Sequence, residues 1–472
     1  MSITGILFLF LFLPISLLLY YISNDEIKRY ILLCSNIVFY SLCSLKFLNL
    51  LIISMIFTVL VGRLIYRLHN VIKRRILLII GIVYNILILG YYKYIGMFLD
   101  VFRKIFNTDF SVGNIVLPLG ISFFTFKSIS YLADIYTKKV QLDDSIVQDL
   151  VYLSFFPQIQ SGPLTRVGDM LSPVEKQQRG DLFSQGVYRF LIGFNKKVLL
   201  SNVLSNITSE VFSASIDLYS TSYAWLGSIC FTLQLFFDFS GYSDMAIGLS
   251  NMFGYKCMEN FDYPYTTNSI AKFWRRWHIS LSQWFRDYIY IPLGGSRGKN
   301  KYKVYFNLLI VWTLTGIWHG ASWTFVVWGL GYFVMISFEK ITGLPDKIKT
   351  RAGKIIYRIF TLLFINCEWV IFKSESIIQG LRYIKTMFVY KYNSNATIRT
   401  GYLLKNYFVF LILAVILSFP IVPKIEEKIK EKSKKMFYLF EICKMVIIFA
   451  LFIVSLSFVI SGQNNPFAYA NF

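Results

Sequence analysis

The chain has 472 residues, 56% of them hydrophobic, and a mean hydropathy of +0.54. This composition lies far outside the soluble range, so it excludes an ordinary soluble protein and predicts a chain embedded mostly in lipid. The formal net charge of +22 could indicate nucleic-acid binding, but most of the charges lie in short clusters between apolar runs. Such clusters are typical of membrane topology signals and of contact with anionic lipid headgroups, so we expect a bilayer and no nucleic-acid partner.

Apolar stretches of spanning length recur along the whole chain. Since about 20 residues are needed to cross the hydrocarbon, these stretches predict an all-α polytopic membrane protein with about 10–12 embedded helices. Shorter runs near 147–160 and 186–201 predict tilted, broken or re-entrant helices that other helices cover. We find one membrane domain over residues 1–472 and no soluble domain. The spanning stretches are 3–22, 30–45, 47–62, 76–99, 114–135, 222–250, 303–338, 355–372, 403–422 and 437–460.

The basic loops predict the orientation of the chain. Lys28 and Arg29 follow the first stretch and a basic cluster at 63–75 follows the third, whereas the turn between the second and third carries Lys46. Lysine and arginine are enriched in cytoplasmic loops, so we expect a multi-pass protein of the cell membrane with its N-terminus outside. The connector 424–435 mixes lysine and glutamate, which predicts a solvent-exposed segment.

Three histidines make the search for catalytic residues short. His69 lies in a basic loop and is expected to be an ordinary surface residue. His278 and His319 lie in the two segments where aromatic, glycine and charged residues are most concentrated.

The first of these segments, FWRRWHISLSQWFRDY at 273–288, separates by side-chain type if it forms one helix. An interfacial amphipathic helix with snorkelling arginines would give the same pattern. The cationic face ends beside the Gly-Gly turn of IPLGGSR, which favours a site for an anionic substrate such as a coenzyme A thioester. One face would carry Arg275, His278, Ser282 and Arg286, and the other Trp277, Leu281, Trp284 and Tyr288.

The second segment, NLLIVWTLTGIWHGASWTFVVWG, places His319 near the middle of an apolar span. An ionisable residue at that depth is costly to bury and therefore suggests function. A hydrogen-bonded core histidine is the alternative. Desolvation would favour the neutral imidazole, which can act as a general base. The helical face shared with His319 would carry Trp312, Thr315, Gly316 and Trp323.

Two more clusters combine polar residues with apolar surroundings. Asp238 and Asp244 lie in a long span, where carboxylates must be paired or protonated, and an arginine of the 273–288 helix is the expected partner. A structural role is favoured for both over a catalytic one. FFPQIQSGPLTR at 155–166 has two prolines and a glycine, and such a broken backbone at membrane depth is expected to line a tunnel.

Several motifs are absent from the sequence. It has no Walker A loop, HExxH, GxSxG or HxxxxD motif, which removes support for ATP hydrolysis, zinc proteolysis and hydrolase chemistry. Its six cysteines form no CxxC pair, so neither a metal site nor a disulfide framework is expected.

FWRRWHISLSQWFRDYIYIPLGGSR followed by TGIWHGASW is similar to the paired signatures of the membrane-bound O-acyltransferases. QLFFDFSGYSDMAIGL and FFPQIQSGPLTR resemble the bacterial, alginate O-acetyltransferase-like branch, whereas WVIFKSE at 369–375 departs from its usual Phe-Arg-Ala. The resemblance implies a ring of helices around a central tunnel, with His319 as the catalytic histidine and His278 as the accompanying signature residue. The expected donor-binding or supporting residues are Arg275, Arg276, Trp277, Ser282, Arg286, Trp318, Asp238 and Asp244.

The branch also implies the reaction and its partners. An acetyl group would pass from cytoplasmic acetyl-CoA, a co-substrate rather than a cofactor, to a hydroxyl for O-acetylation of an extracellular or cell-wall polysaccharide. An extracytoplasmic SGNH-type esterase-like protein would be the partner. D-alanyl transfer from a carrier protein in teichoic-acid modification is an alternative within the family. A transporter or flippase for polysaccharide intermediates is an alternative from another class, since broken helices and a basic interior suit transport as well.

Overall fold

The computed structural model describes residues 1–107, 115–142, 145–171, 179–296, 301–462 and 467. These residues form two compact units. Unit 1 holds Met1–Phe190 and Ser243–Glu259, and unit 2 holds Leu191–Tyr242 and the described residues from Asn260 to Phe467. Helices α10 (Arg179–Asn195) and α12 (Thr221–Met252) contribute residues to both.

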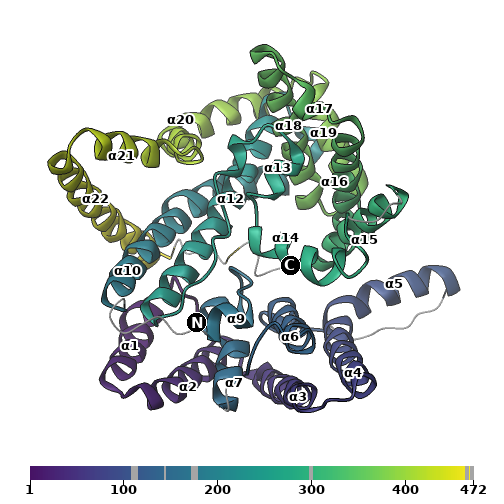
Figure 1. Ribbon diagram of the computed structural model, residues 1–472. Coiled ribbons are helices and arrows are strands. Elements are labelled where there is room, and N and C mark those ends of the chain that lie inside the picture. The colour runs from purple at the N-terminus through teal and green to yellow at the C-terminus, as the bar shows by residue number, and fades with distance from the viewer. Residues whose placement is uncertain (108–114, 143–144, 172–178, 297–300, 463–466, 468–472) are drawn as a thin grey trace. The chain divides into compact units, whose positions relative to one another are not determined.

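Unit 1 packs around α6, which is buried along nearly its whole length. The helix lies against α3 and α4, and α7 covers α2 and α3 (Figure 1). The segment 155–166 is broken into the short helix α8 and irregular backbone, and most of it is buried within the unit. That this segment lines a tunnel stays a prediction. The helices of unit 1 are η1 Phe8–Phe12, α1 Leu13–Ile22, α2 Asp25–Ser44, η2 Leu45–Phe47, α3 Leu48–Arg67, α4 Val71–Leu89, η3 Gly90–Tyr94, α5 Ile95–Phe106, α6 Ile121–Tyr136, α7 Ile146–Ser154, α8 Phe156–Ile159 and α9 Val167–Leu171.

Unit 2 contains both candidate catalytic histidines. In the part of the chain that the structure describes, its one β contact is an isolated antiparallel bridge between Phe261 and Trp277. Its helices are η5 Lys196–Ser201, α11 Asn202–Ser213, η6 Ile216–Leu218, η7 Pro264–Thr266, α13 Ile270–Trp274, α14 Ile279–Phe285, η8 Arg286–Tyr290, α15 Lys301–His319, α16 Trp323–Thr342, α17 Leu344–Lys347, α18 Arg351–Lys373, α19 Ile377–Phe388, α20 Ser394–Leu417, α21 Ile421–Lys432 and α22 Lys434–Ile460.

The all-α membrane fold is confirmed. Six helical runs among the described residues are long and apolar enough to cross a membrane, and Phe8–Ile22 is a shorter apolar run. The predicted connector 424–435 is largely the exposed helix α21 and the start of α22. The six runs are Asp25–Arg67, Val71–Arg103, Trp323–Thr342, Arg351–Lys373, Ser394–Leu417 and Lys434–Ile460.

The predicted single span at 303–338 is wrong, because this stretch is a hairpin of α15 and α16 with a break at 320–322 (Figure 1). Two glycines allow the helices to touch. A Cβ atom on Gly316 would lie 2.4 Å from the Phe325 carbonyl oxygen, and one on Gly329 would lie 2.4 Å from the Trp312 carbonyl oxygen. Such backbone contact is what small residues provide between membrane helices.

We predict that Gly329→Ala destabilises the protein, because the added methyl group must push α15 away from α16. Overpacking of this kind costs about 1–3 kcal/mol, which should lower the melting temperature of the purified protein in detergent. Gly401→Ala is the matched control, since a Cβ atom at Gly401 of α20 meets nothing within 4 Å. Equal melting temperatures for the two variants would contradict the close packing.

Candidate active site

His319 is the last residue of α15 and is 2% exposed. It therefore lies at a helix end beside the hairpin turn, not in the middle of a span as predicted. Aromatic rings surround its imidazole, with ring centroids 4.9 Å away for Trp318, 4.9 Å for Trp328 and 5.3 Å for Phe372. Trp323, expected on the same helical face, is instead the first residue of α16 and is exposed. Packing of α15, α16 and α18 thus encloses the imidazole in apolar surface.

The predicted single helix at 273–288 is also wrong. Helix α13 ends at Trp274, His278 adopts a left-handed conformation with φ of 46°, and α14 begins at Ile279. The backbone of the preceding loop stabilises this break, because the amide of Ile279 donates to the Asn260 carbonyl at 3.0 Å. The proposed common face of Arg275, His278, Ser282 and Arg286 therefore does not exist.

His278 is completely buried, and its imidazole packs against Trp318, the same aromatic residue that contacts His319. The Trp318 ring centroid lies 6.1 Å from that of His278 and 4.9 Å from that of His319. Phe239 also packs against His278, with perpendicular ring planes and ring centroids 4.5 Å apart. The structure thus brings together the two histidines that the sequence singled out, with Trp318 in contact with both.

The hydrogen bonding of His278 is set by Asn260. Its Nδ1 lies 3.1 Å from the Asn260 Oδ1. Burial lowers the pKa of His278, which lies outside the membrane-spanning helices, to about 3. The imidazole is therefore neutral at physiological pH.

Four tryptophans near the histidines have buried indole N–H groups with no hydrogen-bond acceptor among the described residues. Trp328 faces His319 directly, and Trp369 stacks on Trp328 with ring centroids 5.9 Å apart. Unsatisfied buried donors are unfavourable, and at an acyl-transfer site they can stabilise a developing oxyanion. The four are Trp274, Trp277, Trp328 and Trp369.

Glu339 of α16 anchors the start of α13. The carboxylate is 5% exposed and accepts hydrogen bonds from the backbone amides of Ile270 at 2.7 Å and Ala271 at 2.9 Å. The Tyr357 hydroxyl donates to the same carboxylate at 2.9 Å. These bonds join α13, α16 and α18, and a carboxylate is well suited to the positive end of a helix.

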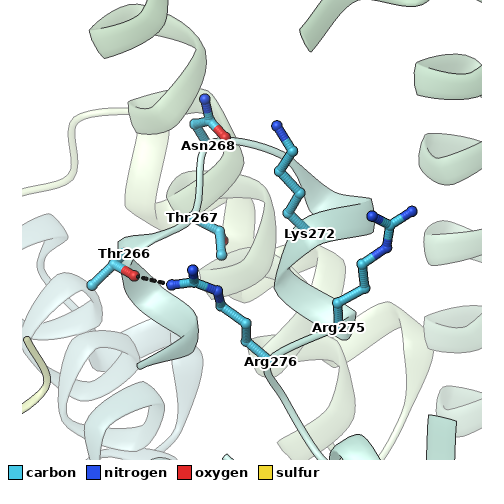
Figure 2. A pocket seen from close by; sticks show the side chains of 6 residues that line it. All are labelled: Thr266, Thr267, Asn268, Lys272, Arg275 and Arg276. Atoms are coloured by element: carbon cyan, nitrogen blue, oxygen red, sulfur yellow. Dashed lines mark hydrogen bonds between the residues drawn. The ribbon is translucent and has the colours of Figure 1, made fainter. Parts of the chain in front are cut away.

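A basic cavity of about 200 Å³ opens beside α13. Figure 2 shows the Arg276 guanidinium directed at Thr266, to which it donates at 3.0 Å, while Lys272 and Arg275 extend separately. Arg275 makes no hydrogen bond or ion pair with any residue that the structure describes. The lining residues are Thr266, Thr267, Asn268, Lys272, Arg275 and Arg276.

The other predicted donor-side residues lie in different surroundings. Arg286 is mostly exposed and pairs with its neighbour Asp287 at 2.7 Å. The Ser282 hydroxyl donates to the Trp274 carbonyl at 3.2 Å and so ties α14 to α13. Trp277 is buried against Phe273 and Trp369, with centroids 5.5 and 5.0 Å away.

The two aspartates are paired, but not with an arginine of 273–288. In unit 2 the Asp238 carboxylate lies 2.6 Å from the Lys197 Nζ, and the two side chains are 1% and 2% exposed. In unit 1 Asp244 lies 2.7 Å from Arg189, which also pairs with Glu259. The predicted partner is therefore corrected, and buried pairing of this kind is consistent with the structural role favoured for both aspartates.

Sequence reasoning missed Asn260, Trp328, Phe372 and Glu339. Trp328 lies in the same apolar run as His319, so its aromatic type was a usable signal. Asn260 lies 18 residues from its partner His278 in the sequence, and Glu339 lies 69 residues from its partner Ile270. Nothing in the local sequence pattern indicates either contact. No group of three metal-ligating side chains occurs among the described residues.

Comparisons with known proteins show which family the chain belongs to. The profile of the membrane-bound O-acyltransferase family matches residues 143–378. A probable alginate O-acetylase of Pseudomonas aeruginosa is 38% identical over 389 residues, covering 81% of this chain and 74% of that protein. The peptidoglycan O-acetyltransferase of Helicobacter pylori is 34% identical over 416 residues, covering 81% and 78%. The teichoic acid D-alanyltransferase of Bacillus subtilis is 29% identical over 284 residues, covering 56% and 70%.

We predict that Asp238→Ala destabilises unit 2 because it leaves Lys197 buried without its ion-pair partner. Removing one member of a buried pair costs about 3–5 kcal/mol. The double variant Lys197→Met/Asp238→Leu should recover much of this loss, as measured by thermal unfolding in detergent. A double variant less stable than Asp238→Ala would argue against the structural role.

Proposed function

The chain belongs to the membrane-bound O-acyltransferase family and is an acyltransferase, and we propose that it transfers acetyl groups from acetyl-CoA to a hydroxyl with His319 as general base. The observation that carries this proposal is the burial of His319 and His278 beside one tryptophan, Trp318, whose ring contacts both imidazoles. An unprotonated imidazole in an apolar enclosure is suited to accept a hydroxyl proton.

The proposed reaction needs a single base. His319 takes the proton of the acceptor hydroxyl as its oxygen attacks the thioester carbonyl carbon. The carbon–sulfur bond then breaks, and the imidazolium returns the proton to the departing thiolate. The products are the ester and free coenzyme A, so His319 ends in its starting state.

The carbonyl oxygen becomes negatively charged during the attack and needs hydrogen-bond donors. The indole N–H of Trp328 is the proposed donor, because the Trp328 ring contacts the His319 imidazole with ring centroids 4.9 Å apart. The absence of an acceptor for this N–H among the described residues supports the assignment. The surrounding aromatic rings exclude water, which strengthens such a hydrogen bond and limits hydrolysis of the thioester.

The basic cavity is the proposed site for the phosphate groups of coenzyme A. Trp274, directly before Arg275, contacts Trp328 at 5.6 Å, and Trp328 contacts His319. Two ring contacts thus separate the cavity wall from the base. The extended pantetheine arm, which contains two amide units, is long enough to bridge that gap.

Charge distribution supports a cytoplasmic opening for this cavity. Lys272 lies 3.8 Å from Asp346 in the loop between α16 and α18. Lys347 and Lys349 lie in that connection, Lys340 lies near the end of α16, and Arg351 and Lys354 lie at the start of α18. Such loops remain in the cytoplasm, where acetyl-CoA is found. We accordingly propose a cell-membrane location with the N-terminus outside.

The proposed acceptor is a hydroxyl of a cell-surface polysaccharide, reached with an extracytoplasmic SGNH-type partner. The alginate and peptidoglycan O-acetylating relatives support this choice by their identity and coverage. The D-alanyltransferase relative is less similar and covers less of the chain, so D-alanyl transfer from a carrier is the second candidate. Consumption of acetyl-CoA by the purified protein, compared with a D-alanyl carrier, separates the two.

We predict that His319→Ala lowers acetyl transfer by at least about 10²–10⁴-fold, the usual contribution of a general base. The ester content of surface polysaccharide and acetyl-CoA consumption by purified protein are the measurements. His69→Ala is the matched control, because His69 is exposed. Normal ester content in a correctly inserted His319→Ala protein would disprove the mechanism.

We predict that Lys272→Glu/Arg275→Glu raises KM for acetyl-CoA about tenfold or more and changes kcat little, since the cavity binds phosphate away from the reacting atoms. The double variant should raise KM less for acetyl-dephospho-CoA than for acetyl-CoA, because acetyl-dephospho-CoA lacks the 3′-phosphate. Lys428→Glu reverses the charge of an exposed lysine on α21 and serves as control. Equal KM values for the wild type, the double variant and the control would contradict the proposal that this cavity binds the phosphate groups.

A further inference from the structure

Asn260 clamps the chain around His278 with both its backbone and its side chain. Its carbonyl accepts from the amide of Ile279 at 3.0 Å. Its Oδ1 accepts from the amide of Ser280 at 3.2 Å and from the Ser280 hydroxyl at 2.8 Å, and lies 3.1 Å from the His278 Nδ1. Asn260 is 1% exposed, so solvent does not compete for these bonds.

The backbone of His278 shows that the clamp holds a strained conformation. A φ of 46° lies in the left-handed region, which a residue other than glycine adopts uncommonly and at an energetic cost. Such strain persists where surrounding contacts over-determine the geometry, and it concentrates at functional sites. The bonds from Asn260 to Ile279 and Ser280 supply those contacts on the next two residues.

The same contacts determine which nitrogen of His278 carries the proton. A backbone N–H can only donate, so the amide of Ser280 identifies the Asn260 atom facing it as the oxygen. An amide oxygen can only accept, so the Nδ1 beside it must be the N–H. In the neutral imidazole the other nitrogen, Nε2, then bears the lone pair.

We propose that Asn260 is a positioning residue that holds His278 in the Nδ1–H tautomer and makes its Nε2 a hydrogen-bond acceptor for an N–H or O–H group of the bound substrate. This inference rests on the proposed function for its substrate, but not for the tautomer. It also narrows the role of His278: a neutral ring of this tautomer cannot donate through Nε2 to the thioester carbonyl. Polarisation of that carbonyl then falls to the indole N–H groups.

Solid-state 15N NMR of histidine-labelled protein in lipid bilayers tests the tautomer directly. The chain has three histidines, so His69→Ala and His319→Ala assign the His278 signals by subtraction. We expect a protonated Nδ1 and an unprotonated Nε2 in the wild type. Asn260→Ala should shift the ring toward the Nε2–H form, whereas Asn260→Asp should keep Nδ1–H. A wild-type ring protonated at Nε2 would overturn the proposal.

Activity measurements test the functional consequence. Asn260→Ala should lower kcat/KM about 10–100-fold, as loss of an orienting partner does, and Asn260→Asp should restore most of it. Ser280→Ala is the matched control, since it removes one hydrogen bond to Oδ1 and leaves the His278 contact. If Asn260→Ala and Ser280→Ala lose activity only in proportion to melting temperature, the role is structural and the proposal fails. A wild-type protein with the expected tautomer but no thioester-dependent transfer would instead refute the proposed function.

Discussion

The buried, broken backbone between residues 260 and 280 is the constraint on which the site depends. A buried amide without an acceptor is unfavourable, so each change of direction here needs a partner from elsewhere. Glu339 supplies it at the start of α13, and Asn260 supplies it at the start of α14. Both partners also fix a functional group: Glu339 holds the helix beside the basic cavity, and Asn260 holds His278. Local folding and positioning of the site are thus achieved by the same hydrogen bonds.

His319, the second histidine of the site, is positioned by close helix packing at two glycines, which have no side chain. Gly316 and Gly329 let α15 and α16 meet at their backbones, and this contact brings Trp328 onto His319. Aromatic side chains from α16 and α18 then fill the space around the imidazole. Rings tolerate close edge-to-face packing, so they form a rigid enclosure without introducing charge. The position of His319 therefore depends on helix packing, whereas that of His278 depends on hydrogen bonds.

The sequence predicted those features that depend on neighbouring residues, and it did not predict those that depend on contacts between residues far apart in the chain. Hydropathy identified the membrane class, and the scarcity of histidine identified both imidazoles, because each signal is local. The prediction of one helix at 273–288 was wrong because helical periodicity cannot reveal that His278 adopts a φ of 46°, a conformation that contacts from distant residues stabilise. The prediction that His319 lies in the middle of a span was wrong because the apolar composition continues through the break between α15 and α16. Lys197 and Arg189 were missed as partners of the aspartates because ion pairing between distant segments leaves no periodic pattern.

The distribution of charge within unit 2 shows how a basic protein can keep the surroundings of its candidate active site free of formal charge. Lys197 is buried, but Asp238 neutralises it, and Lys272 and Arg275 lie at an open cavity where water screens them. The rings around His319 carry no formal charge. A cation beside His319 would favour the neutral imidazole but would also attract water, which in the proposed mechanism would compete with the acceptor hydroxyl for the thioester. In the proposed mechanism, confining the cations to the cavity would retain their attraction for the phosphate groups of coenzyme A. The reacting carbonyl would meanwhile be surrounded by apolar rings and a few N–H donors, which act most strongly where the dielectric constant is low.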